Sequence, residues 1–333
     1  MIFYMTLISG ILITISSNSW LSAWMGLEIN LLSFIPIMSN KENIFTAEAS
    51  LKYFLIQALA SSVLLFIIIS KSLIDSVFSI ISQYITNVMV VSPLLMSTGA
   101  APLHWWFPSV MEGLSWVNCF NLMTIQKIAP LVLISYAIKL NTFLYMIIIS
   151  SVLIGSIGGY NQVSIRKILT YSSINHIGWM LAAMLMGENM WVMYFMIYAL
   201  LTLTIIYIIK PMQISFINQI MFIFLENKII KFLMFTSLLS LGGLPPMLGF
   251  MPKWIIIQYL TYNSHLLIST VMVILSLITL YYYLRITYSS FILLNSQPTW
   301  ITSVSKNKID TISVVLTSLS MFGLLGSVIC FNY

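Results

Sequence analysis

The residues with the clearest chemical potential are three charges, Glu28, Lys127 and Lys253, each in the middle of a long apolar run. A charge at the centre of a bilayer costs about 2.5–3.5 kcal/mol on insertion scales, and residues that persist there usually serve a function. None can easily reach the interface. Burial disfavours the charged form of both residue types, which suits them to proton exchange. The set favours a proton or ion path, and structural ion pairs between helices are the alternative.

Four other residues are weaker candidates for a functional role. Histidine titrates near neutrality, and His176 follows the polar stretch Ser172–Asn175, although a hydrogen-bonded packing role explains it equally well. His104 ranks higher because it lies beside a predicted helix break. Glu48 and Lys52 are four residues apart, and a local ion pair on one helix face explains them without a function.

Two apolar segments contain residues that interrupt helices, at 99–102 (Gly-Ala-Ala-Pro) and at 242–246 (Gly-Gly-Leu-Pro-Pro). Proline removes a backbone donor and glycine permits unusual dihedral angles. Backbone freed at membrane depth is tolerated only where protein or water satisfies it, and transporters use such helices at ion sites. We therefore expect two discontinuous helices near the buried charges, with simple proline kinks as the alternative.

The elements that must position these residues are membrane helices. The chain has 333 residues, of which 60% are hydrophobic and 7% charged, whereas a soluble domain has about 25% charged residues. The sequence predicts a single all-α membrane domain over 1–333, a polytopic bundle of about eleven helices. The expected segments are 2–17, 20–38, 48–70, 80–100, 114–138, 143–159, 168–186, 190–209, 232–260, 265–290 and 312–331. An apolar run at 214–225 could form a helix on the membrane surface.

The net charge of +6 comes from scattered residues, so nucleic-acid binding is not expected. Basic residues lie mostly in loops on the N-terminal side of the segments, which predicts that the N-terminus faces the inner compartment. Those residues are Lys41, Arg166, Lys167, Lys210, Lys228, Lys231, Lys306 and Lys308, against Lys71 and Lys139 on the other side. Cys119 and Cys330 have no metal-binding spacing, and no dinucleotide-binding turn is visible, so we expect no redox centre in this chain.

Several blocks of the sequence carry a resemblance to a known family, and these are Trp24–Pro36, Glu48–Leu55, Gln126–Pro130, Arg166–Leu169, Tyr171–Met180, Leu239–Pro246, Lys253–Trp254 and Tyr283–Arg285. They resemble the antiporter-like, proton-translocating membrane subunits of mitochondrial NADH dehydrogenase, complex I. The resemblance runs from about Trp20 to Arg285, and the segment 312–331 matches only by position and hydropathy.

This resemblance implies an antiporter-like fold with inverted five-helix repeats over a core of about 20–290. By this resemblance, Glu28 corresponds to the family's central glutamate, and Lys127 and Lys253 correspond to its relay lysines. His104 corresponds to the family's histidine after the first break. Ser97 departs from the pattern, because the family usually has a lysine there that partners the glutamate. We expect Ser97, Thr98 or water beside the Glu28 carboxylate instead, with Lys52 and Lys127 as competing partners.

The function implied is proton translocation across the inner mitochondrial membrane as a subunit of NADH:ubiquinone reductase. The NADH, FMN, iron–sulfur clusters and ubiquinone would be bound elsewhere in the complex, with none bound by this chain. The implied partners are other complex I membrane-arm subunits and inner-membrane phospholipids, and the N-terminus would face the matrix. A stand-alone cation/proton antiporter and a non-conducting structural membrane subunit are the alternatives.

Overall fold

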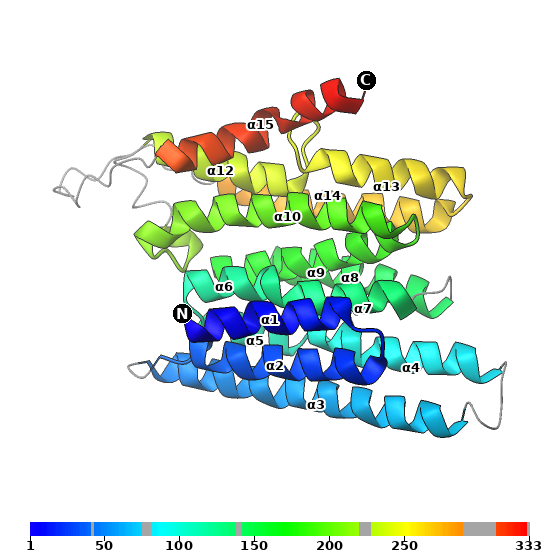
Figure 1. The fold of residues 1–333 in the computed structure, drawn as a ribbon. Helices are drawn as coiled ribbons and strands as arrows, with labels where there is room; N and C mark the ends of the chain where they lie inside the picture. Colours follow the sequence, from blue (N-terminus) through cyan, green and yellow to red (C-terminus); the bar gives the residue numbers. More distant parts are fainter. Residues whose placement is uncertain (41–42, 75–80, 138–141, 220–227, 289–310, 332–333) are drawn as a thin grey trace. The chain divides into compact units, whose positions relative to one another are not determined.

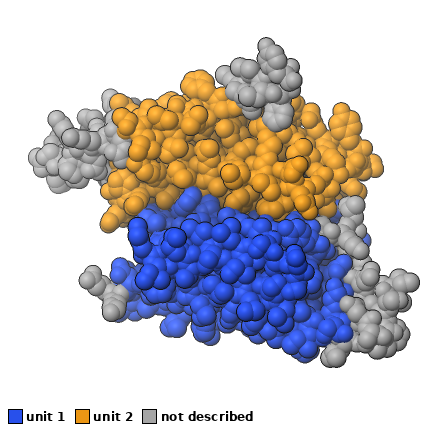
Figure 2. All heavy atoms as spheres, in the orientation of Figure 1, with its two compact units in different colours: residues 1–151 blue, residues 152–333 orange. Residues whose placement is uncertain are grey.

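The computed structural model describes residues 1–333 except 41–42, 75–80, 138–141, 220–227, 289–310 and 332–333. Its described residues form helices and connecting loops, and the β-structure among them is one isolated bridge between Ser164 and Phe216 (Figure 1). The predicted all-α class is confirmed. The chain divides into two compact units, Met1–Ser151 and Val152–Tyr333 (Figure 2). That both units form one membrane domain stays a prediction.

Unit 1 is a bundle in which α7 packs against α1, α2 and α4, and α3 packs against α2, α4 and α5. Its elements are α1 (Ile2–Ser16), α2 (Trp20–Met38), α3 (Ile44–Ile74), α4 (Ile81–Thr98), α5 (Trp106–Gly113), α6 (Trp116–Met123) and α7 (Ile125–Ala137). The helix α8 (Thr142–Tyr160) begins in unit 1 and ends in unit 2. Because α7 packs against several helices, protein surrounds its side chains on several faces.

In unit 2, α10 packs against α9, α12, α13 and α15, while α14 packs against α12 and α13. The elements are α9 (Ile165–Met184), α10 (Glu188–Ile209), the 3₁₀ turn η1 (Lys210–Met212), α12 (Lys228–Gly242), α13 (Phe250–Tyr262), α14 (Leu266–Tyr288) and α15 (Thr311–Phe331). Almost every residue of α9 is buried, including polar ones such as Ser172, Ser173 and Asn175. A helix buried on all sides must satisfy its polar groups within the protein.

Six helical spans of the described residues are long and apolar enough to cross a membrane. They are Trp20–Met38, Ile44–Ser72, Trp116–Ala137, Thr142–Tyr160, Glu188–Met212 and Leu266–Tyr288. Shorter apolar helices account for 2–16, 86–98, 229–242 and 311–324. Half of the predicted surface helix over 214–225 lies outside the described residues, and in its described half only 217–219 are helical, after the bridge residue Phe216.

The structure departs from the predicted elements around the second half of unit 1. The expected single segment 114–138 is divided at Thr124, which has φ −120° and ψ −73° between α6 and α7. Thr124 donates both its backbone N–H and its hydroxyl to the Phe120 carbonyl, and Lys127 N donates to the Thr124 carbonyl at 3.0 Å. The helix α5 was not predicted, because its eight residues follow a Gly/Pro-rich stretch and are too few to span a bilayer.

The crossing of α1 and α2 depends on two glycines. A Cβ placed on Gly26 would lie 2.6 Å from Thr14 Cγ2 and 3.0 Å from the Gly10 carbonyl oxygen, and one on Gly10 would lie 3.0 Å from Asn30 N. Small residues allow helix backbones in membranes to approach this closely. The close contact sets the position of the α2 segment that carries Glu28 and Asn30.

We expect Gly26→Val to destabilise the protein by about 1–3 kcal/mol, because the added atoms must separate α1 from α2. The measurement is the melting temperature and yield of the assembled protein in membranes. Met25→Val is the matched control, since Met25 is adjacent and 51% exposed. Equal stability of the two variants would show that the glycine contact is not required.

Candidate functional site

Lys127 is enclosed by unit 1. It lies three residues after the turn at Thr124 and is only 2% exposed. Its Nζ is 4.8 Å from the centroid of the Phe107 ring, which α5 supplies. A ring face stabilises a cation by its quadrupole, and this attraction strengthens when the cation is desolvated. The Lys127 side chain therefore lies inside the protein against an aromatic face of α5.

The residue before Lys127 connects three helices. Gln126 Nε2 donates to Asn30 Oδ1 at 3.2 Å, and the Tyr53 hydroxyl donates to Gln126 Oε1 at 3.2 Å. The Tyr53 ring also packs against two other rings. Its centroid lies 5.4 Å from that of Phe34 and 6.0 Å from that of Trp106. These contacts fix the start of α7, and with it the backbone from which Lys127 projects.

A cavity of about 30 Å³ lies next to this network. By volume it has room for about two water molecules. Gln57 Nε2 donates to the Ser97 carbonyl at 3.1 Å across the cavity wall, and the Ser97 hydroxyl donates to Leu94 O at 2.8 Å. The polar side chains of the lining are Asn30, Tyr53, Gln57, Ser61, Ser97 and Gln126. All of them are uncharged, so the cavity offers hydrogen bonds without a fixed charge.

Glu28 is half-buried on α2, and its Oε2 atom is buried without a hydrogen-bond partner. No lysine nitrogen of the described residues therefore makes a hydrogen bond to that oxygen. The Ser97 hydroxyl donates within α4, to the Leu94 carbonyl. The expectation that Ser97, Thr98 or water lies beside the Glu28 carboxylate, with Lys52 and Lys127 as competing partners, stays a prediction.

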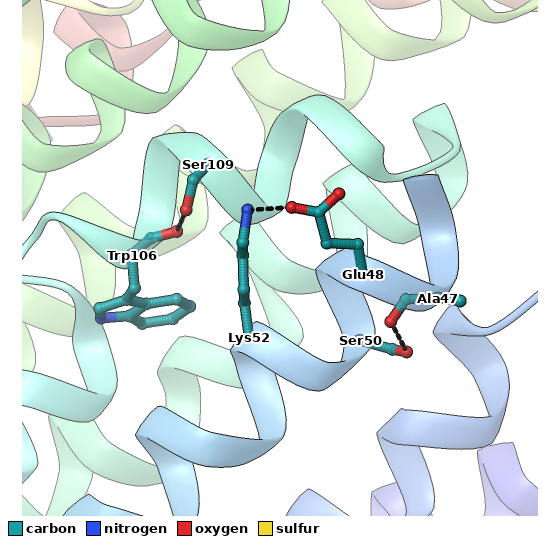
Figure 3. A network of polar contacts seen from close by, with 6 residues as sticks. All are labelled: Ala47, Glu48, Ser50, Lys52, Trp106 and Ser109. Carbon is teal, nitrogen blue, oxygen red and sulfur yellow. Dashed lines mark hydrogen bonds and ion pairs between the residues drawn. The ribbon is translucent and has the colours of Figure 1, made fainter. Parts of the chain in front are cut away.

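Glu48 and Lys52 form the local ion pair expected from their spacing. Lys52 Nζ lies 2.6 Å from Glu48 Oε1 on the surface of α3, with side chains 45% and 57% exposed (Figure 3). Figure 3 also shows that the neighbouring Trp106–Ser109 and Ala47–Ser50 contacts each remain within one helix. Exposed pairs contribute little to stability. The pair supplies a matched control for the buried charges.

Lys253 is held by the end of another helix. It lies on α13, is 5% exposed, and donates from Nζ to the carbonyl of Gly242, the last residue of α12, at 2.9 Å. The helix ends there because Gly243 takes φ +83° and its N–H donates back to Leu239 and Ser240. Carbonyls at a helix C-terminus carry partial negative charge, which favours a cation. The Trp179 ring lies 5.9 Å from Nζ.

The two candidate histidines have different surroundings. His104 is half-buried, and its Nδ1 contacts the Pro102 carbonyl of its own loop at 3.2 Å. His176 is 6% exposed, and its Nδ1 lies 2.8 Å from the hydroxyl of Tyr194 on α10. His176 therefore has a polar partner on another helix, whereas the contact of His104 is local. Which of the two histidines takes part in the relay stays a prediction.

Sequence reasoning did not select the partners of these groups. The amide of Gln126 was noted only as part of a motif, and Asn30, Tyr53, Tyr194 and Tyr198 were not candidates. A usable signal did exist for Tyr194 and Tyr198, because two tyrosines four residues apart lie on one helix face. Hydroxyls on the same face of an otherwise apolar helix need polar partners when buried.

The sequence of this chain matches a known protein family. Residues 17–279 match the family described as "NADH:quinone oxidoreductase/Mrp antiporter, TM". The chain is 53% identical to "NADH-ubiquinone oxidoreductase chain 2" of Anopheles gambiae over 327 residues, which covers 97% of this chain and 95% of that one. The protein of the same name from Locusta migratoria is 45% identical over 98% of this chain and 95% of its own length.

The chain belongs to the NADH:quinone oxidoreductase/Mrp antiporter family. Its fold agrees with solved structures of low sequence identity. A chain of respiratory complex I from Thermus thermophilus matches with a TM-score of 0.81 at 21% identity, covering 97% of this chain and 78% of that one. A chain of the Mrp complex from Dietzia matches with a TM-score of 0.78 at 18% identity, covering 89% and 61%. This chain therefore shares its fold with chains in which most residues differ.

Proposed function

We propose that this chain is a core membrane subunit of respiratory NADH:ubiquinone oxidoreductase, complex I, and takes part in proton translocation across the inner mitochondrial membrane. Two lysines enclosed in apolar helices carry the proposal, since Lys127 and Lys253 are 2% and 5% exposed. Family membership supplies the context in which such charges are useful. Electron transfer belongs to other subunits, which hold the NADH, FMN, iron–sulfur clusters and ubiquinone.

The proton relay would use Glu28, Lys127 and Lys253, with His176, His104 and Ser97 in secondary roles. Each lysine can bind a proton as an amine and release it as an ammonium, and the glutamate can likewise bind a proton as a carboxylate and release it as a carboxylic acid. The enclosing helices keep bulk water away from both lysines. Around Ser97, the cavity lined by Gln57, Tyr53 and Gln126 would let water carry protons where relatives of the family use a lysine.

The helix ends support an antiporter-like arrangement of two discontinuous helices. In unit 1, α4 ends at Thr98, Gly99 takes φ +76°, and α5 begins at Trp106. In unit 2, α12 ends at Gly242 and α13 begins at Phe250. The carbonyls freed at such an end favour a cation, as Lys253 illustrates. We further propose that the N-terminus faces the matrix and that membrane-arm subunits and phospholipids surround the chain.

The test is Glu28→Gln in the assembled complex, in inner-membrane vesicles. Glutamine keeps the shape of the side chain and cannot exchange a proton. We expect the complex to assemble, with fewer protons pumped per NADH and coupled NADH oxidation slowed at least about tenfold, as for loss of a positioned proton-transfer group. Glu48→Gln is the matched control, because Glu48 is 57% exposed and paired with Lys52, and it should pump normally.

The alternatives give different results. A stand-alone antiporter would exchange cations for protons when the purified chain alone is placed in liposomes, whereas we expect no exchange there. A non-conducting structural subunit would keep wild-type pumping after Glu28→Gln. Either result would contradict the proposal.

A further inference from the structure

The C-terminal ends of α8 and α14 meet at one end of unit 2, and two tyrosines are exposed there. The Tyr160 and Tyr281 rings stack with their centroids 5.4 Å apart and their planes at 12°. The two residues are 46% and 50% exposed. A Cβ placed on Gly159 would lie 3.0 Å from Tyr282 Cε1, so α8 packs closely against α14 beside the stack. Packing of the two helices therefore holds the stacked rings at the surface.

Arg285 lies one turn after Tyr281 on α14 and reaches across to α8. Its Nη1 donates to the Tyr160 carbonyl at 3.2 Å, at the end of α8, where helix carbonyls carry partial negative charge. This contact uses one of the five N–H donors of the guanidinium. Arg285 is exposed, and it forms no ion pair with a residue that the structure describes. Its other donors are therefore held beside the two tyrosines and open to a ligand from outside the chain.

Exposed apolar side chains continue from the tyrosine stack along both helices. On α8 and α14 they recur three, four or seven residues from Tyr160 or Tyr281, so they share the face of the nearby tyrosine. These residues are Leu153 and Ile157 on α8, and Ile274, Leu277, Leu284 and Tyr288 on α14. Tyrosines concentrate at the level where acyl chains meet headgroups in a membrane. An apolar face that ends in tyrosines and an arginine therefore has the polarity profile of a phospholipid.

The charges at this end of unit 2 favour an anion. Arg166 and Lys167 lie in the first turn of α9, and Lys210 directly follows α10. The loop after α10 pairs with the loop between α8 and α9 through the isolated β-bridge, so these cations share one end of the unit. Among the described residues of unit 2, the acidic one is Glu188, at the start of α10. That helix has 22 residues and is about 33 Å long, which places the carboxylate at the opposite end.

We propose that Arg285 and the Tyr160–Tyr281 stack bind the phosphate of an anionic phospholipid, whose acyl chains lie along the exposed faces of α8 and α14. A guanidinium can bind phosphate through two parallel N–H bonds, which are about twice as strong as neutral hydrogen bonds. Basic pockets between membrane helices bind anionic headgroups in the same way. A zwitterionic phospholipid carries a cationic amine beside its phosphate, which the basic residues at this end repel. The site is independent of the proton relay.

The test uses the assembled complex in phosphatidylcholine vesicles that contain a trace of phosphatidylglycerol with a photoreactive acyl chain. After illumination, mass spectrometry of the digested complex locates the labelled residues. We expect labels within 153–160 and 274–288. Unlabelled phosphatidylglycerol should displace them, whereas added phosphatidylcholine and inorganic phosphate should not. In Arg285→Gln the labelling of these segments should fall about tenfold, as for the loss of hydrogen bonds to a charged group.

Lys210→Gln is the matched control, because it removes an exposed cation from the same end of unit 2 and lies outside the tyrosine stack. Its labelling should match that of the wild type. An equal fall in both variants would mean that the general positive charge of this end attracts the lipid, and it would overturn the site.

Displacement by phosphatidylcholine or by inorganic phosphate would also contradict the proposal. So would a wild-type complex without labels in these segments, which is the result expected if another subunit covers this face. Should Arg285→Gln not assemble, the wild-type complex decides: displacement by phosphatidylglycerol alone supports the site, and displacement by either other competitor overturns it. None of these results depends on proton pumping, so they test the lipid site separately from the proposed function.

Discussion

Lys127→Met is expected to leave the complex assembled while coupled NADH oxidation falls at least about tenfold, because a positioned proton-transfer group typically contributes that much or more. Methionine has nearly the same length, so the space under the Phe107 ring stays filled. The proton-binding nitrogen is lost. Proton pumping per NADH in inner-membrane vesicles, together with the amount of assembled complex, measures the effect.

Lys52→Met is the matched control for this change. It removes the same group from a lysine whose side chain is 45% exposed and paired with Glu48. We expect normal pumping there, since exposed pairs contribute only about 0–1 kcal/mol. An assembled Lys127→Met complex that pumps like the wild type would remove Lys127 from the relay.

Lys253→Met is expected to have two separable effects. Removing the ammonium leaves the Gly242 carbonyl without this donor, which costs about 1–3 kcal/mol and weakens the end of α12. It also removes a proton-binding group from the interior of unit 2. The expected result is a lower melting temperature of the complex and loss of coupled proton pumping.

Lys253→Arg separates these effects. Arginine keeps a charged donor that can reach the Gly242 carbonyl, but it does not release its proton in proteins. The arginine variant should therefore recover stability and assembly without recovering pumping. Wild-type pumping with arginine would mean that Lys253 acts as a fixed charge that caps α12, and its place in the relay would have to be abandoned.

Many of the helices could be predicted from the apolar runs in the sequence. Apolar runs of membrane-spanning length predict helices because the backbone must satisfy its own hydrogen bonds in lipid. The expected segments 20–38, 143–159 and 190–209 correspond to α2, α8 and α10 within a few residues. The segment 114–138 corresponds to the span Trp116–Ala137, but the irregular backbone at Thr124 that separates α6 from α7 has no hydropathy signal.

The burial of the key lysines was likewise implied by sequence. Lys127 and Lys253 lie within apolar runs, so enclosure by neighbouring helices is the arrangement that keeps them from lipid. Their low exposure agrees with this. The aromatic rings against them, Phe107 and Trp179, could not be chosen in advance, since many aromatic residues are available and only packing brings one to each ammonium.

The sequence by itself therefore determined the membrane class, the helices and which charges are enclosed, because these follow from local hydrophobicity over about 20 residues. Only the tertiary structure decided the partners. Gln126 bonds to Asn30, 96 positions away, and Tyr53 bonds to Gln126 across 73 positions. Lys253 caps α12 because Gly243 ends that helix beside it. Such contacts depend on how helices cross, and crossing depends on side chains far apart in the chain.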